Sequence, residues 1–280
     1  MIPMTFSSQT PSVMGILNIT PDSFSDGGLF LATDAAITHA EEMVGKGASI
    51  IDIGGESTRP GYQKISASEE CLRITPVIRE LCGRAVLSVD SYKYEVAKCA
   101  IEAGCSILND VNGLRDDEGE NKAHLAAAND AYVVLMYNRR LINSGSDVIA
   151  DARESLSRSV DIALAGGVAE DKIIIDPGIG FGTTREEDRR LTMELKDINP
   201  AGFPILYACS RKRFVKCFDF GEGKDPTWVL NMVAVEAGAS LLRVHDPKPF
   251  GQYMDDFFNE GSGTEELIRA KEVIEWTRLS

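Results

Sequence analysis

Residues 172–184 read KIIIDPGIGFGTT, and this stretch gives the clearest indication of the fold. Three consecutive isoleucines end in Asp176, and three glycines follow between residues 178 and 182. A short, continuously apolar run is typical of a parallel strand that is buried on both faces. Glycine lacks a Cβ atom, so the backbone after such a strand can come close to a ligand. The stretch therefore indicates a buried parallel strand with a carboxylate at its carboxyl end.

The same unit of an apolar run followed by a helical pattern recurs along the whole chain. The predicted strands cover residues 13–19, 49–54, 85–90, 106–111, 131–137, 172–176, 204–209 and 239–245. The predicted helices cover residues 33–46, 66–82, 92–103, 119–129, 150–166, 184–197, 227–237 and 263–278, with Ser66, Thr184 and Thr227 as N-caps and a capping box of Ser66 with Glu69.

Eight strand–helix units without a change of composition predict an α/β fold, a (β/α)8 TIM barrel that forms one domain over residues 1–280. A doubly wound open sheet is the competing architecture. It normally carries a glycine-rich dinucleotide turn after the first strand, and NITPDSFSDGG at 18–28 is not such a turn.

Composition and charge narrow the class of partner. The 280 residues carry a net charge of −14, which disfavours nucleic acid and anionic membrane surfaces as partners. The six cysteines form no CxxC pair and no zinc spacing, and the N-terminus MIPMTFSSQTPS has no apolar signal segment. These features favour a reduced protein of the cytoplasm, and an anionic small substrate would need a local basic pocket.

Polar side chains gather at the carboxyl ends of the predicted strands. They follow seven of the eight strands, and they include Asn18, Glu56, Asp90, Asn109, Asp110, Asp176, Ser210, Lys212, Arg243 and His245. A lone aspartate in such a place is more often a helix N-cap, and for Asp110 and Asp246 that reading stays open. Because all strands of a barrel end at one mouth, the convergence instead predicts an active site there.

The residue types at this mouth divide into two halves. Asp90, Asn109 and Asp176 offer hydrogen-bonding groups that suit the edge of a flat heterocycle. The other half suits phosphate oxygens through charge-assisted bonds, with Lys212 and Arg211 between the halves, and it comprises Asn18, Arg59, Arg243 and His245. A ligand with a polar ring and a phosphorylated arm fits both halves. Mg²⁺ is typically bound through one protein oxygen, a diphosphate and waters, so this ion would suit such a ligand.

Seven motifs, in this order, carry a resemblance to a known family. They are GILNITPDSFSDGG (15–28), DIGGESTRPG (52–61), SVDSYKYEVAKCAIEAG (88–104), LNDVNGL (108–114), IIDPGIGFG (174–182), SRK (210–212) and RVHD (243–246). Together they resemble the dihydropteroate synthases. The resemblance implies a homodimeric barrel that joins p-aminobenzoate to 6-hydroxymethyl-7,8-dihydropterin diphosphate in folate synthesis, with Mg²⁺ and with sulfonamides as competitors of the aminobenzoate.

The resemblance also implies a role for each matching residue. The pterin ring would be held by Asp90, Asn109, Asp176 and Lys212. The diphosphate would be held by Asn18, Arg243 and His245, with Mg²⁺ near Asn18. The aminobenzoate pocket would be bordered by Thr58, Arg59, Pro60, Phe181 and Ser210, and completed by Asp22 and Phe24 from the first loop. The residues closest to the chemistry would be Lys212, Asp176, Arg243 and Asp22.

The sequence departs from the family at a few positions near the mouth. Thr183 stands where members usually carry lysine after GFG, residues 136–140 replace a Met-His-Met segment, and Arg213 replaces a small residue. Two other interpretations stay open. A pterin-binding methyltransferase shares the barrel but does not need the SRK and RVHD cluster, and a non-catalytic paralogue would bind pterin without turnover. The loops 18–32 and 55–65 are expected to act as lids.

Overall fold

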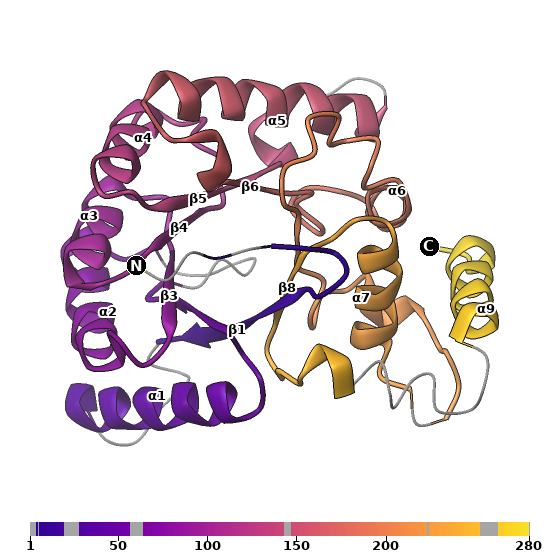
Figure 1. Ribbon diagram of the computed structural model, residues 1–280, viewed down its shortest axis with the longest axis horizontal. Coiled ribbons are helices and arrows are strands. Elements are labelled where there is room, and N and C mark those ends of the chain that lie inside the picture. The colour runs from indigo at the N-terminus through magenta and orange to yellow at the C-terminus, as the bar shows by residue number, and fades with distance from the viewer. Residues whose placement is uncertain are drawn as a thin grey trace.

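The computed structural model describes residues 4, 6–19, 28–56, 64–142, 147–222, 224–252 and 263–279. Helices alternate with the strands of one sheet and surround it (Figure 1). The strands are β1 Ser12–Asn18, β2 Ile50–Gly54, β3 Val86–Asp90, β4 Ile107–Asp110, β5 Tyr132–Met136, β6 Ile173–Asp176, β7 Leu206–Tyr207 and β8 Leu241–Val244. The helices are α1 Gly28–Gly45, α2 Ala67–Leu81, α3 Tyr94–Ala103, α4 Gly119–Ala128, α5 Val148–Ala165, α6 Arg185–Met193, α7 Pro226–Glu236 and α9 Gly263–Trp276.

The strand pairing closes the sheet into a barrel. The eight strands follow the order β6-β5-β4-β3-β2-β1-β8-β7, and neighbouring strands in this order pair in parallel. A parallel bridge between Ile175 and Ile205 joins the two ends of this order, where the Ile175 N–H donates to the Pro204 carbonyl at 2.9 Å. The predicted single-domain (β/α)8 barrel is confirmed, and the open-sheet alternative is excluded because that sheet would not close.

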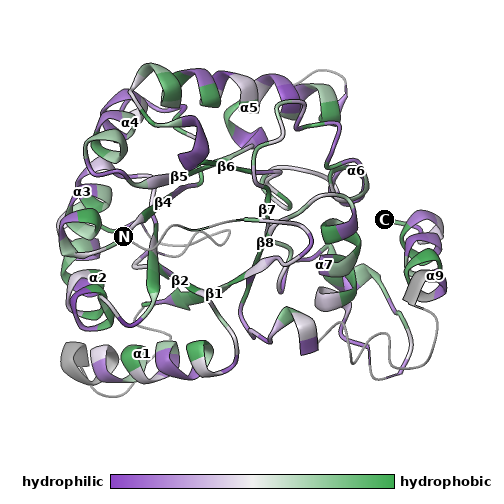
Figure 2. Cartoon of the chain, in the orientation of Figure 1, coloured by the Kyte–Doolittle hydropathy of each residue, from purple (hydrophilic) through white to green (hydrophobic). Residues whose placement is uncertain are grey.

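Both faces of the strands are buried, which explains their continuous apolar runs. Ile50, Ile107, Ile174 and Leu241 pack inside the barrel, while neighbouring strand residues pack against the surrounding helices. Each such side chain stabilises the fold by roughly 1.5–3 kcal/mol through burial. Figure 2 shows the resulting pattern, in which strands are mostly hydrophobic and helices carry hydrophilic residues on parts of their surface.

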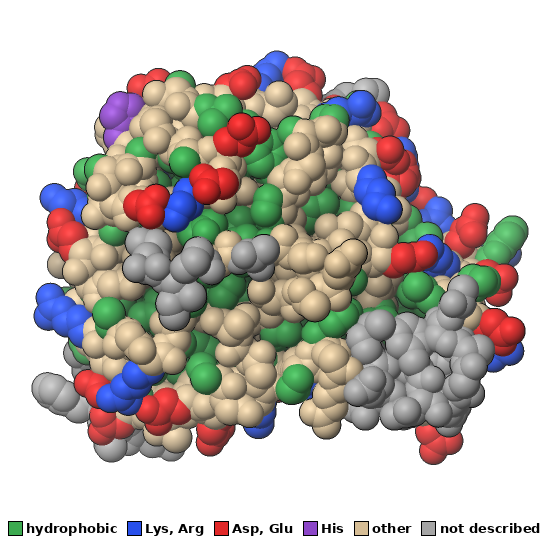
Figure 3. Space-filling view, in the orientation of Figure 1, with side chains coloured by type: hydrophobic (Ala, Val, Ile, Leu, Met, Phe, Trp, Pro, Cys, Tyr) green, Lys and Arg blue, Asp and Glu red, His purple; other side chains and the backbone are tan. Residues whose placement is uncertain are grey.

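The N-terminal segment covers one end of the barrel. The Phe6 ring packs edge-on against Tyr132, 5.6 Å between centroids, and the Tyr132 hydroxyl donates to the Met4 carbonyl at 3.3 Å. Tyr132 begins β5, so this is the end where the strands start. The charged side chains of the face shown in Figure 3 gather toward its periphery. Since the N-terminal segment covers the end where the strands start, the carboxyl ends of the strands form the mouth at the opposite end of the barrel.

The structure corrects two details of the sequence-based prediction. β7 spans only Leu206–Tyr207, because the Ile205 N–H donates to the Ser240 hydroxyl at 3.1 Å and Ile205 makes an isolated bridge instead of continuing the strand. Helix α7 is capped by Asp225, whose carboxylate accepts from the Thr227 N–H, and not by Thr227. Pro226 occupies the first helical turn, where its missing N–H has no cost.

The predicted caps of the other two helices are confirmed. The Ser66 hydroxyl accepts from the Glu69 N–H at 3.1 Å, but the Glu69 carboxylate pairs with Arg73, so the structure shows the predicted cap without the reciprocal bond of a capping box. Thr184 and Glu187 form the complete capping box of α6.

Candidate active site

The predicted pterin and diphosphate residues lie at or next to the carboxyl ends of their strands, except Lys212, which lies in the loop after β7. Strand register places Asp90 beside Asn109, and Asn18 beside Gly54. A Cβ atom on Gly54 would lie 3.6 Å from Asp90 Cβ and 3.7 Å from Asn18 Oδ1, so these two side chains flank the same glycine. The mouth thus joins groups that are far apart in the sequence.

Arg243 forms the charged centre of this mouth. Its Nε donates to Asp52 Oδ2 and its Nη2 donates to Asp90 Oδ2, both at 2.6 Å. The Asn109 amide donates to the same Asp52 oxygen at 3.0 Å. Burial lowers the pKa of Arg243, but the two carboxylates raise it more, and the net shift is upward. Arg243 therefore stays charged between two acids.

Asp52 belongs to this cluster and was missed in the sequence. Its side chain is fully buried in the middle of β2, in the run IIDIG. A carboxylate inside an apolar strand is unusual unless it is paired, and that signal could have drawn attention to it. The reason for its presence is the Arg243 guanidinium from the opposite end of the chain.

Two carboxylate oxygens in the cluster are left for a ligand. Among the described residues, Asp52 Oδ1, Asp90 Oδ1 and the Ser88 hydroxyl are buried without a hydrogen-bond partner. A buried oxygen without a donor is costly, so such atoms often mark a place where a ligand donates. Burial raises the pKa of Asp90 to about 7, Arg243 opposes this shift, and the neighbouring Asp52 adds to it.

Asp176 is held by the backbone that follows it. Its Oδ1 accepts from the Gly178 N–H at 2.7 Å. Gly178 has φ +71°, and a Cβ atom there would lie 1.7 Å from the Tyr137 carbonyl oxygen, so only glycine fits. The buried strand therefore ends in a carboxylate followed by glycines because the glycine turn binds the carboxylate and packs against the neighbouring strand end.

Lys212 lies beside Asp176. Its ammonium donates to the Ile179 carbonyl at 2.6 Å and lies 4.9 Å from the centroid of the Phe181 ring. Burial raises the pKa of Asp176, and the Lys212 charge opposes that shift. Burial likewise lowers the pKa of Lys212, and Asp176 opposes it. The two groups thus support each other's charged form in a poorly solvated place.

Ser210 and His245 meet at the end of β7 and β8. The Ser210 hydroxyl lies 2.9 Å from His245 Nδ1 and accepts from the His245 N–H at 3.3 Å. The predicted aminobenzoate residue Ser210 therefore touches the predicted diphosphate residue His245. The remaining predicted residues, Asp22, Phe24, Thr58, Arg59 and Pro60, lie outside the described residues, as do most positions of the two expected lids.

A buried ionic cluster fixes both ends of the segment that carries Thr58 and Arg59. The Lys93 ammonium lies 2.7 Å from Glu56 Oε2, 2.8 Å from Glu70 Oε2 and 2.9 Å from the Ile65 carbonyl. The Ile65 N–H also donates to Glu56 at 2.9 Å. Glu56 and Ile65 stand on either side of residues 57–63, so the start and the end of that segment are joined next to the mouth.

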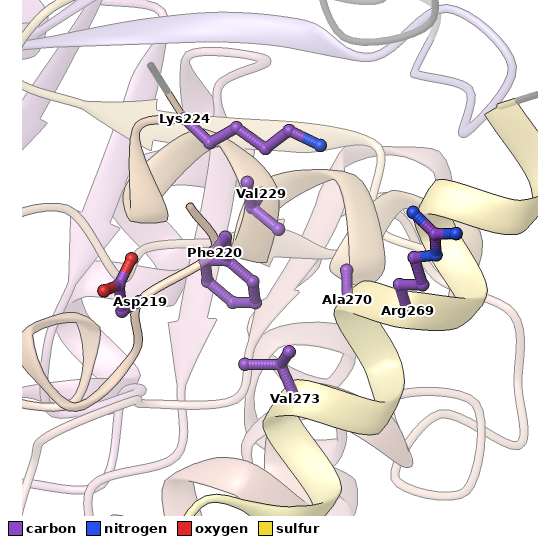
Figure 4. Close-up of a pocket in the computed structure, with 7 residues that line it drawn as sticks. All are labelled: Asp219, Phe220, Lys224, Val229, Arg269, Ala270 and Val273. Atoms are coloured by element: carbon purple, nitrogen blue, oxygen red, sulfur yellow. The ribbon is translucent and has the colours of Figure 1, made fainter. Parts of the chain in front are cut away.

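Outside the mouth, the described residues form a cavity between α7 and α9 but no cluster of potential metal ligands. A cavity of about 230 Å³ lies between the segment 219–224, α7 and α9, and it shares no residue with the strand-end cluster (Figure 4). Within the described ranges, no group of three acidic, histidine or cysteine side chains could hold a metal ion. No described helix is long and apolar enough to cross a membrane.

Comparison with known proteins gives one consistent result. The family model of the pterin binding enzymes matches residues 14–245. The dihydropteroate synthase of Bacillus subtilis is 42% identical over 257 residues, which is 89% of each chain.

Solved structures agree with these sequence matches. The dihydropteroate synthase of Clostridium difficile, crystallised in the presence of pteroic acid, has a TM-score of 0.79, 34% identity, and coverage of 98% of this chain and 100% of that chain. The Xanthomonas albilineans dihydropteroate synthase with 4-aminobenzoic acid has a TM-score of 0.79, 34% identity, and coverage of 90% and 94%.

Proposed function

Since the chain belongs to the family of pterin-binding enzymes, in the group of the dihydropteroate synthases, we infer that it joins 6-hydroxymethyl-7,8-dihydropterin diphosphate to p-aminobenzoate. The products are 7,8-dihydropteroate and pyrophosphate, so the activity is that of a transferase. The observation that carries this function is the strand-end cluster in which Arg243 lies between Asp52 and Asp90.

The pterin ring is proposed to lie among Asp90, Asn109, Asp176 and Lys212. The unpartnered Asp90 and Asp52 oxygens suit the N–H groups of the ring, because an ionised carboxylate only accepts. Lys212 supplies a donor close to Asp176, so the site offers donors as well as acceptors. Asp90, Asn109 and Asp176 are held by strand ends, which supports a rigid position for the ring.

The diphosphate is proposed to contact Asn18, Arg243 and His245. Arg243 uses Nε and Nη2 for its two acids, which leaves further N–H groups of its fork for phosphate oxygens. When the carbon–oxygen bond of the pterin breaks, the electron pair goes to the departing pyrophosphate, and the cations near it stabilise that charge. The amine nitrogen bonds to the pterin methylene carbon and then loses a proton.

Mg²⁺ is proposed as the metal that accompanies the diphosphate. Asn18 offers one amide oxygen at the end of β1, which suits an ion that takes most of its ligands from phosphates and water. The bound ion would neutralise part of the negative charge that develops on the leaving group.

The arylamine is proposed to lie against Phe181 and Ser210, with Asp22, Phe24, Thr58, Arg59 and Pro60 completing its pocket. Catalysis then needs no enzyme nucleophile, because holding the amine against the methylene carbon supplies much of the rate. Lys212, Asp176, Arg243 and Asp22 are the residues proposed to act closest to the bonds that change.

The affinity for unphosphorylated 6-hydroxymethylpterin is expected to rise with pH in the window around the pKa of Asp90, which is about 7. Below that pH the carboxyl is protonated and loses an acceptor, and above it the carboxylate accepts fully, so Kd should fall by about tenfold. Isothermal titration calorimetry at several pH values measures this. The Asp90→Asn variant, which cannot titrate, should show a flat profile, and a flat profile in the unaltered protein would contradict the assignment.

The function itself is tested by mixing the purified protein with the dihydropterin diphosphate, p-aminobenzoate and Mg²⁺ and following pyrophosphate release. Product formation that stops when either substrate is omitted is the expected result. Tight pterin binding without product would favour the non-catalytic paralogue instead. Competition of sulfonamides with p-aminobenzoate is expected in the same assay.

We also propose that the chain forms a homodimer in the cytoplasm, with residues 1–280 as one pterin-binding domain. The exposed Ile268 and Trp276 on α9 support a surface that a second copy could cover. The six cysteines are free thiols, which agrees with a reducing compartment. Sedimentation at several concentrations tests the dimer.

A further inference from the structure

The segment after β5 forms a short turn packed on the loop after β6. The turn η2 spans Arg139–Leu141. The Arg139 N–H donates to the Phe181 carbonyl at 3.1 Å. A Cβ atom on Gly182 would lie 2.8 Å from Arg140 Cγ, so glycine is needed for the turn to come this close. Residues 139–140 therefore sit directly on the loop of the proposed arylamine pocket.

Asn138 fixes the start of this turn. Its side chain is 8% exposed, its Oδ1 accepts from the Arg140 N–H at 3.2 Å, and its Nδ2 donates to the Val111 carbonyl at 3.0 Å. These bonds tie the turn to the loop after β4 as well. The backbone of Arg140 is thus held from two neighbouring strand ends.

The Arg140 side chain extends over Phe181. Its guanidinium carbon lies 5.3 Å from the ring centroid, within the range of a cation–π contact. The partly buried Lys212 contacts the same ring at 4.9 Å, so two cations share one aromatic ring. Phe181 is therefore flanked by a cation from the proposed pterin site and by a cation from the rim of the mouth.

Arg140 differs from its neighbour Arg139 in its ion pairs with the described residues. Arg139 lies 3.0 Å from a Glu187 oxygen and 3.9 Å from an Asp151 oxygen. No ion pair to Arg140 is found among the residues that the structure describes, and the residue is solvent-exposed. An exposed arginine in a fixed place without an anion is available to bind one.

Thr183 stabilises the loop after β6. Its hydroxyl donates to Asp188 Oδ1 at 2.5 Å and accepts from the Gly180 N–H at 3.0 Å. Gly180 also donates to Asp188 at 2.8 Å. Thr183 therefore stabilises the glycine-rich loop. The cation that contacts Phe181 from the rim of the mouth is Arg140, in the turn after β5.

We propose that Arg140 binds the carboxylate of the arylamine substrate and so selects p-aminobenzoate over uncharged anilines. This rests on the proposed function, in which the arylamine lies against Phe181. The amine must face the pterin methylene near Lys212, so the para carboxylate points toward the rim, where Arg140 lies. The planar guanidinium fits a carboxylate with two parallel hydrogen bonds, which an ammonium cannot match.

The test is the Arg140→Ala variant of the full chain in the product assay. The KM for p-aminobenzoate should rise about tenfold, as for one lost charge-assisted contact at a partly solvated rim, with kcat and the KM for the pterin diphosphate unchanged. Sulfanilamide, which has no carboxylate, should inhibit both enzymes with the same inhibition constant. Arg140→Lys should fall between the two.

Arg153→Ala removes an equal charge from an exposed position on α5 and should change none of these values. An unchanged KM for p-aminobenzoate in Arg140→Ala would overturn the proposal, as would an equal weakening of sulfanilamide, since the effect would then concern the ring stack and not the carboxylate. If the unaltered protein makes no product, it is the proposed function that fails. If it turns over and Arg140→Ala behaves identically, only the role of Arg140 fails.

Discussion

The Asp176→Asn enzyme is expected to lose about a thousandfold or more in kcat/KM for the pterin substrate. Asparagine keeps the shape of the side chain, and its oxygen can still accept from the Gly178 N–H that now binds Asp176 at 2.7 Å. The second atom, however, changes from an acceptor to a donor, and in the proposed complex it would meet the N–H groups of the pterin. Lys212 also loses the opposite charge that offsets its burial.

The loss should appear both in turnover and in pterin binding measured by calorimetry. Asp171→Asn provides a matched control, because Asp171 is exposed in the turn that precedes the same strand. That variant should keep its activity, and both proteins should melt at similar temperatures. An Asp176→Asn enzyme within tenfold of the unaltered protein would mean that this carboxylate does not bind the ring.

Removal of the Arg243 side chain is expected to have the second large effect, on stability as well as on activity. Arg243→Met leaves the carboxylates of Asp52 and Asp90 without their cation, and loss of one partner of a buried pair costs about 3–5 kcal/mol. Turnover should also disappear, because the same guanidinium is proposed to hold the diphosphate. Urea denaturation and the product assay measure the two effects.

The stability loss of Arg243→Met should depend on pH with a definite sign. Burial already raises the pKa of Asp90 to about 7 in the presence of Arg243, and removal of the cation raises it further. A carboxyl whose pKa is higher in the folded than in the unfolded protein holds a proton that unfolding releases, so stability falls as pH rises toward the folded pKa. The deficit should be small near about pH 5.5 and largest above about pH 8.

Arg211→Met is the control for this measurement. Arg211 pairs with Asp246 at 2.9 Å, with side chains that are 58% and 78% exposed, and such surface pairs contribute about 0–1 kcal/mol. An equal loss at both pH values in Arg243→Met would show that the defect is one of packing and not of unpaired buried acids.

The fold could be predicted from the sequence because each barrel strand is buried on two faces. That burial produces continuous apolar runs such as IIID, and the polar residue that ends each run marks the mouth. All eight strands and their helices were found in this way, with β7 the least accurate, because Ile205 makes only a bridge at the seam of the barrel. The local sequence pattern was sufficient to predict these strands because the pattern results from the burial of the same residues.

The pairing of side chains across the mouth could not be predicted. Asp52 and Arg243 are 191 positions apart, and nothing in the run IIDIG says which cation meets its carboxylate. The contact of Arg140 with Phe181 likewise depends on how two neighbouring loops pack. Residue types at strand ends indicated the chemistry of the site, but only the closed barrel determines which of them touch.

A crystal structure of the protein with a dihydropterin diphosphate analogue tests most directly the claim that one mouth holds both the ring and the diphosphate. We expect the ring to contact Asp90, Asn109, Asp176 and Lys212, and the phosphates to contact Asn18, Arg243 and His245. A ligand that bound elsewhere, for example in the cavity between residues 219–224 and α9, with the strand-end cluster untouched, would contradict this account.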